Sequence, residues 1–252
     1  MKKILLFGLV GILLLVVIGV AVVVSSLSSI IKTGIETVGP EVVGVPMTVE
    51  AVELSLLAGE ARVKGLVVGN PKGFQTARAF KLGDAKVSVD LKSALSDKVI
   101  IKEILIDGPE VTYESGPSGN NINKIQENVA TFAKSVTPKD AAASKSPKKD
   151  SPQKKVQIND FIFKSGKVTM SSSMLQGKPI MISLPDIHLR DIGKESGGVT
   201  PETAAAEVFK AINKAVVQSV SKGAEEAVKS IGSGSGEAGS KAVEGLKGLF
   251  GK

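Results

Sequence analysis

Few residues of this chain could carry out acid–base or nucleophilic chemistry. His188 is the only histidine among 252 residues, and Asp186, Arg190 and Asp191 stand close to it. An imidazole beside a carboxylate can act as a general base. Nucleophilic catalysis also needs a nucleophile next to the base and a third group that orients the base, and the sequence offers no such set. We therefore interpret His188 as a hydrogen-bonded residue at the surface or at the edge of a groove.

Two carboxylates form the second candidate pair. Asp84 and Asp90 belong to one alternating segment, and their spacing of six residues places them on the same face of a strand. Paired carboxylates can share general acid–base work. Lys86 stands between them on that face. We therefore expect a solvated, charged face and not an acid–base pair.

The residue inventory excludes whole classes of site. The chain has no Cys, which excludes disulfides, thiol nucleophiles, iron–sulfur clusters and zinc sites with thiolate ligands. A single His excludes multi-histidine metal sites, and no glycine-rich phosphate-binding loop leads from a strand into a helix. The sequence predicts no catalytic residue, no metal site and no bound cofactor, and hence a protein that is not an enzyme.

The positive charge of the chain is concentrated in one segment. The formal net charge is +7, and the seven Lys and two Asp between Lys134 and Lys155 contribute +5 of it. Residues 136–154 are rich in Lys, Ser, Ala and Pro, which predicts a disordered linker. This linker has no aromatic residue on which a base could stack. We therefore expect no nucleic-acid partner.

Residues 4–24 form the longest apolar segment. Its 21 residues would reach about 31 Å as a helix, roughly the hydrocarbon thickness of a bilayer. A cleavable signal peptide has a shorter apolar core and a small-x-small cleavage site, which the segment after Ala21 lacks. The sequence favours an uncleaved single-span anchor, with a cleaved signal peptide as the alternative. Lys2 and Lys3 precede the span, which predicts a cytoplasmic N-terminus with the rest of the chain in the periplasm of a bacterium.

Strand and turn signals dominate from residue 47 onward. Residues 85–91 alternate apolar and polar without an error, which is typical of a strand with one buried and one wet face. Further predicted strands cover residues 47–54, 62–69, 99–106, 110–114, 156–163, 167–172 and 179–189. Because the gaps between the early strands are short, we expect a meander of about five antiparallel strands over residues 47–114.

Helical spacing appears in four places, and it completes a division of the chain into five parts. Apolar residues predict helices over residues 26–38, 121–134 and 200–222 and a weak amphipathic helix near the C-terminus. We expect the first of these helices to end at Gly39-Pro40. The parts are an anchor (1–25), a β domain with helices (26–135), the linker (136–154), a second β segment with a helix (155–222) and a Gly-rich tail (223–252). We expect the second β segment to complete the first sheet, with two separate domains as the alternative.

An ordered set of short motifs occupies residues 45–124. They read VPMTV at 45–49, LSL at 54–56, GLVVGNPKGF at 65–74, LGDAKV at 82–87, VIIKEI at 99–104, IDGPEV at 106–111 and NNI at 120–122. In this order after one apolar segment, they resemble the opening domain of the AsmA-like family. Residues 163–192, with LPDI at 184–187, are similar to later repeats of that family.

The resemblance implies a protein of the bacterial inner membrane that faces the periplasm and is linked to phospholipid transfer and outer-membrane biogenesis. It implies an α+β fold in which a mainly antiparallel sheet is curled into a groove with flanking helices, after one transmembrane helix. About eight strands would extend a sheet by only about 40 Å. We therefore expect carriage or scaffolding beside the inner membrane, not a bridge across the periplasm.

Two groups of residues are the candidates for a functional role. The motif residues at turns are interpreted as structural: Asn70, Pro71, Gly73, Phe74, Gly108 and Pro109. The candidate apolar face of the groove consists of Ala85, Val87, Val89 and Leu91. An open face would bind the acyl chains of a phospholipid. The alternative is a membrane-tethered scaffold with a closed core that binds another envelope protein at an exposed strand edge.

Overall fold

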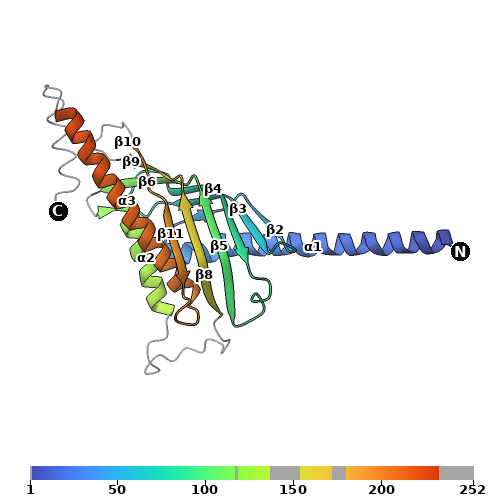
Figure 1. The fold of residues 1–252 in the computed structure, drawn as a ribbon. Coiled ribbons are helices and arrows are strands. Elements are labelled where there is room, and N and C mark those ends of the chain that lie inside the picture. The colour runs from blue at the N-terminus through green and yellow to red at the C-terminus, as the bar shows by residue number, and fades with distance from the viewer. Residues whose placement is uncertain (1, 117–118, 137–153, 172–179, 233–252) are drawn as a thin grey trace.

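The chain forms an open mixed sheet accompanied by helices. A computed structural model describes residues 2–116, 119–136, 154–171 and 180–232, and the side chains of residues 23–116, 119–135, 154–171 and 180–226. This part of the chain contains three helices and one sheet of eleven strands (Figure 1). It confirms the α+β class and the mostly antiparallel sheet. The linker predicted at 136–154 and the predicted C-terminal helix lie outside the described residues, apart from the ends of the linker.

The described strands are 2 to 12 residues long, and burial alternates along shorter ones such as Lys167–Ser171 and Ile180–Ser183. The first seven are β1 (Met47–Thr48), β2 (Ala51–Ser55), β3 (Glu60–Gly69), β4 (Arg78–Val89), β5 (Lys98–Asp107), β6 (Glu110–Gly116) and β7 (Gly119–Asn120). The others are β8 (Lys155–Lys164), β9 (Lys167–Ser171), β10 (Ile180–Ser183) and β11 (Ile187–Ile192). Strands from both sides of the segment 136–154 therefore belong to the same sheet.

The topology of the sheet differs from the predicted meander. Strands β2, β3, β4 and β5 pair antiparallel in chain order, but β6 pairs with β4 and not with β5. Two pairs are parallel, β5 with β8 and β6 with β9. A parallel pair needs a long crossover connection, and helix α2 (Asn121–Val136) lies in the connection between β6 and β8.

One line of interruptions crosses the sheet and explains the unexpected place of β6. Strands β5 and β6 are separated by residues 108–109, β8 and β9 by 165–166, and β10 and β11 by 184–186. In β3 and β4 the same line passes through Gly65 and Gly83, which the pairing skips. Each of these long strands is thus two collinear pieces. Because β6 continues the line of β5, it pairs with the N-terminal part of β4 while β5 pairs with the C-terminal part.

Helix α1 (Lys2–Val43) runs through the predicted stop at Gly39-Pro40. Proline removes one helical hydrogen bond and usually breaks a helix. Here Pro40 lies in the last turn, where its carbonyl accepts the Gly44 amide at 2.8 Å. Gly44 has a φ of 71°, which is typical of a residue that ends a helix. Burial of Val43 and Val45, which are 4% and 3% exposed, stabilises this last turn.

The other two helices pack on each other and on the sheet (Figure 1). Asn120 caps α2 by accepting the Asn123 amide at 2.8 Å. Helix α3 (Pro201–Gly232) begins as predicted, with Thr200 accepting the Thr203 amide at 3.2 Å. It continues beyond the end predicted at residue 222. At Gly223 a Cβ atom would lie 2.6 Å from Ile182 Cδ1, so a glycine there lets α3 approach β10 closely.

The structure does not test the predicted anchor. Among the residues whose side chains are described, which begin at Val23, no helix is both long and apolar enough to cross a membrane. Residues 4–22 of the predicted anchor lie outside them, so the transmembrane span stays a prediction. In Figure 1 the N-terminal part of α1 extends well beyond the sheet.

Candidate functional site: an apolar sheet face that is uncovered at one end

Cross-strand neighbours build a continuous apolar face. The inner row runs next to the line of interruptions and consists of Val52, Val63, Ala85, Ile106, Phe163 and Ile187, each paired with the next across the sheet. Five of these six residues belong to the core cluster or pack against it. Val52 is also buried but is not part of that cluster. Helix residues such as Val216 and Val220, which are fully buried, complete this core. The inner row is therefore covered.

The second row lies one pleat further from the line and is covered only in part. Leu54 pairs with Ala61, Ala61 with Val87 and Val87 with Ile104. Ile104 packs against the core, whereas Leu54, Ala61 and Val87 are half-buried and do not belong to it. The same apolar face thus becomes accessible toward the ends of β2, β3 and β4.

The four residues predicted to form the groove face follow this gradient. Ala85 is 7% exposed and belongs to the core, while Val87 and Val89 are half-buried. Leu91 is 49% exposed and lies beyond the end of β4. The register shifts between Ser88 and Val89, so the strict alternation in the sequence does not describe the last part of this strand. The structure therefore places one member of the predicted face in the core and one in a turn.

The motif residues at 70–74 belong to a polar network that fastens the β3–β4 loop. Asn70 donates from Nδ2 to the Thr76 carbonyl at 2.7 Å, and its Oδ1 accepts from Nδ2 of Asn121 at 2.7 Å. Asn121 is completely buried and also accepts the Glu114 amide at 2.9 Å. Pro71 is buried, Phe74 is half-buried and Gly73 has a φ of 97°. These contacts make the motif a structural joint between a loop, β6 and α2.

Glu114 is a residue of this joint that the sequence did not indicate. Its carboxylate accepts the Gln75 amide at 2.6 Å, the Thr76 amide at 2.8 Å and the Thr76 hydroxyl at 2.6 Å. Burial of Glu114 acts to raise its pKa, but the hydrogen bonds from Thr76 and Gln75 outweigh it, so the pKa is lowered. The only signal in the sequence was an acidic residue at the end of the predicted strand 110–114.

The second motif turn, Gly108-Pro109, is part of the line of interruptions. The Gly108 amide donates to the Lys164 carbonyl at 3.0 Å, and the Pro109 carbonyl accepts the Lys167 amide at 2.9 Å. Gly108 has a φ of 64°, a conformation that glycine adopts without strain. The turn therefore links β5–β6 to β8–β9 exactly where both are interrupted.

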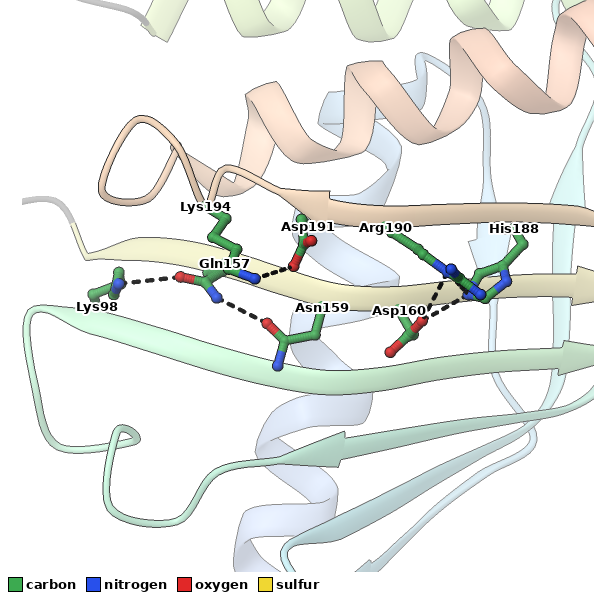
Figure 2. A network of polar contacts seen from close by, with 8 residues as sticks. All are labelled: Lys98, Gln157, Asn159, Asp160, His188, Arg190, Asp191 and Lys194. Carbon is green, nitrogen blue, oxygen red and sulfur yellow. Dashed lines mark hydrogen bonds and ion pairs between the residues drawn. The ribbon is translucent and has the colours of Figure 1, made fainter.

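His188 lies on the opposite, polar face of the sheet (Figure 2). Its Nε2 is 2.6 Å from Oδ1 of Asp160, and Arg190 Nε lies 3.4 Å from the same nitrogen. Both His188 and Asp160 are exposed by more than a third of their side-chain surface. In Figure 2 these side chains lie on the viewer's side of the strands and α1 on the far side. His188 is thus hydrogen-bonded at the surface, with a partner from β8 that sequence proximity could not reveal.

The two other carboxylates considered as a pair have separate partners. Asp84 Oδ2 accepts from Arg62 Nη1 at 3.1 Å. Asp90 Oδ1 accepts the Lys92 amide at 2.8 Å and so closes the turn after β4. Asp84 thus belongs to a charged, solvated face, as expected from Lys86, which itself contacts Glu60 Oε1 at 2.9 Å. Asp90 lies in the turn beyond β4 and not on the strand, contrary to the prediction.

An open pocket of about 860 Å³ lies between β10 and α3, where the sequence predicted no site. Its lining includes Ile180, Ile182, Leu184, Ser219, Lys222 and Glu226. The lining mixes apolar side chains with one charge of each sign, and it lies at an edge of the sheet. The arrangement of polar and apolar groups in this pocket does not indicate a particular ligand.

Comparison with known proteins supports the resemblance seen in the motifs. The profile of the AsmA family matches residues 1–208, which include every described strand and the first turns of α3. No curated protein and no solved structure matches the chain.

Proposed function

The chain belongs to the AsmA family, and from this we propose that it is a non-catalytic envelope protein that binds the acyl chains of phospholipids on the uncovered part of its apolar sheet face. Membership of the family associates it with the cell envelope and with lipids in general. The finer proposal places it in the bacterial inner membrane, anchored by residues 4–24. Lys2 and Lys3 keep its N-terminus in the cytoplasm, and the sheet lies in the periplasm, where it serves lipid transport in outer-membrane biogenesis.

One observation carries the lipid proposal: the row Leu54, Ala61 and Val87 continues the apolar face beyond the core cluster and is only half-buried. An apolar sheet face that stays in water forgoes about 25 cal/mol for each Å² that could be covered. An acyl chain is a partner of matching chemistry, because it offers only methylene groups. A polar ligand would leave its hydrogen-bonding groups unsatisfied on this row.

Site-specific photocrosslinking in cells tests the proposal. A photoreactive benzoylphenylalanine at Val87 is expected to crosslink to metabolically labelled phospholipid after irradiation. The matched control is the same residue at Ser88, which is also half-buried but points to the opposite face of β4. Lipid label at position 87 and not at 88 supports an acyl-binding face. Equal label at both positions, or none at either, contradicts it.

A protein-binding scaffold is the second candidate function, and the edge of the sheet favours it. Strand β10 ends the strand order on one side, and Met181 in it is 76% exposed. An exposed edge can accept a strand from a partner. In the same cells, benzoylphenylalanine is placed at Met181. A crosslink from this position to one protein, with no lipid crosslink at position 87, would favour the scaffold.

A further inference from the structure

Among the described residues, the two most exposed large apolar side chains lie in two turns. Leu57 in the β2–β3 turn is 100% exposed, and Leu95 in the β4–β5 turn is 94% exposed. Leu56 and Leu91 in the same turns are 41% and 49% exposed. Four exposed leucines at one end of a sheet form an apolar patch. Exposed apolar patches on a soluble domain often mark a surface that contacts a partner or a membrane.

The two turns lie side by side. The Val89 amide donates to the Gly59 carbonyl at 2.8 Å, which joins the end of β4 to the β2–β3 turn. A Cβ on Gly59 would lie 3.0 Å from Leu91 Cγ, so the side chain of Leu91 touches that turn. The exposed leucines therefore form one surface, the leucine tip, which we define as Leu56, Leu57, Leu91 and Leu95.

The β4–β5 turn holds Leu95 outward by its own hydrogen bonds. Asp90 Oδ1 accepts the Lys92 amide at 2.8 Å, and the Ser93 hydroxyl accepts the Ile100 amide at 2.8 Å. The Ser96 amide then donates to the Ser93 carbonyl at 2.9 Å. Consecutive turns bonded in this way fix the backbone on both sides of Leu95. Its exposure therefore follows from the fold of the turn.

Lysines flank the β4–β5 turn of the leucine tip. Lys154 donates from Nζ to the Ala94 carbonyl at 3.0 Å, and the Lys155 amide donates to the Asp97 carbonyl at 2.8 Å. Both lysines thus belong to the immediate surroundings of the β4–β5 turn. With Lys92 and Lys98 they outnumber the two acidic residues of this turn, Asp90 and Asp97. Exposed leucines next to an excess of lysines match the chemistry of an anionic lipid surface.

The leucine tip lies on the side toward which α1 extends. Lys32 Nζ donates to the Glu50 carbonyl at 3.0 Å, and Glu36 accepts the Val49 amide at 2.9 Å. From there β2 runs back along α1 toward its N-terminal part (Figure 1). The six steps along the chain from Glu50 to Leu56 span about 20 Å as a strand, the length of about 13 helical residues. The β2–β3 turn therefore lies at most about 13 residues back along α1 from Lys32, near the C-terminal end of the predicted span 4–24.

We propose that the leucine tip docks on the anionic surface of the membrane that holds α1, with Leu57 and Leu95 inserted among the lipids. This inference rests on the proposed function, because the anchor decides which membrane the tip meets. Docking places the uncovered row of Leu54, Ala61 and Val87 next to the bilayer, since this row leads from the tip to the core. An acyl chain can then pass from the membrane to the sheet along apolar side chains alone.

Depth-dependent fluorescence quenching tests the docking. The chain has no Cys, so Leu57→Cys and Leu95→Cys each give one attachment site for an environment-sensitive dye in the full-length protein. The labelled proteins are reconstituted in vesicles of phosphatidylethanolamine and phosphatidylglycerol. We expect blue-shifted emission that spin-labelled lipids quench by more than half. We expect weaker quenching in vesicles of neutral phosphatidylcholine, because the lysines then lose their partners.

Met181→Cys is the matched control, since Met181 is 76% exposed and lies in β10, at the far side of the line of interruptions. A dye there should stay in water and unquenched. Quenching at positions 57 and 95 no stronger than at 181 overturns the docking. Val16→Cys separates this failure from failure of the anchor: a quenched dye at position 16 with unquenched dyes at 57 and 95 leaves the anchor standing. An unquenched dye at position 16 contradicts the anchor itself.

Discussion

Asn121 donates from its Nδ2 to Oδ1 of Asn70 at 2.7 Å, which joins the first residue of α2 to the β3–β4 loop across 51 positions of sequence. The same amide group donates to the Thr112 carbonyl, also at 2.7 Å, and its Oδ1 accepts the Glu114 amide. One fully buried side chain therefore holds a loop, a strand and a helix together.

The replacement Asn121→Ala should destabilise the protein strongly. It leaves the Glu114 amide, the Thr112 carbonyl and Asn70 Oδ1 without their partner in a buried place, and an unsatisfied buried group costs 1–3 kcal/mol. We expect the free energy of unfolding to fall by about 3 kcal/mol in urea titrations followed by circular dichroism. Lys124→Ala, at an exposed position of the same helix, should change it by less than about 0.5 kcal/mol. Equal effects of the two changes would contradict the joint.

Acid should weaken the protein in part through Glu114. The pKa of Glu114 in the folded protein is lowered from its ordinary value of 4.5. A carboxylate of this kind stabilises the fold above its unfolded-state pKa, and that stabilisation is lost as the pH falls through the folded-state pKa. As the pH is lowered below about 4.5, the free energy of unfolding should therefore decrease more in the natural protein than in Glu114→Gln, because glutamine does not titrate. Parallel pH profiles of the two proteins would show that this carboxylate is not stabilised by folding.

Two glycines on the line of interruptions should respond differently to Ala. Gly65 has a φ of 60°, and a Cβ there would lie 2.6 Å from Cβ of Glu50. Gly83 in the neighbouring strand has no atom within 4 Å of a Cβ and an ordinary φ. Gly65→Ala should lower the free energy of unfolding by about 2 kcal/mol, from backbone strain and crowding. Gly83→Ala should leave it within about 0.5 kcal/mol, as measured by denaturant unfolding.

His188→Ala should affect neither the stability nor the proposed lipid contact. The His188–Asp160 pair is solvent-exposed and lies on the polar face of the sheet, and exposed pairs contribute less than about 1 kcal/mol. Lipid crosslinking at position 87 in the His188→Ala background should equal that in the natural background. A loss of crosslinking with unchanged stability would give this histidine a functional role.

The sequence alone predicted the local elements well, because their signals are local. The alternation at residues 85–91 places Ala85 and Val87 on one face and predicts most of β4. The caps at Asn120 and Thr200 begin α2 and α3 where the pattern of residues placed them. The ordered motifs indicated the family that the comparison then showed.

The boundaries that failed were those where packing outweighs local preference. Pro40 predicts a helix end, yet buried Val43 and Val45 keep the last turn of α1 intact. Gly223 predicts a flexible tail, yet the contact with Ile182 retains it within α3. In each case a residue with a low helix propensity lies at or next to a tertiary contact, and this contact stabilises the helix.

What the sequence by itself determined is which side chains share a face and which segments have helical or extended backbone, since periods of 3.6 and 2 residues follow from backbone geometry. Only the tertiary structure decided which strands are neighbours, because the partner of a strand depends on contacts between distant residues. The parallel pairs of β5 with β8 and β6 with β9 depend on the long connection that contains α2. The same packing decided that Phe163 and Ile187 are buried where α3 packs on β8 and β11, while Leu54 and Val87 stay half-buried outside the core, and this difference in burial creates the candidate lipid face.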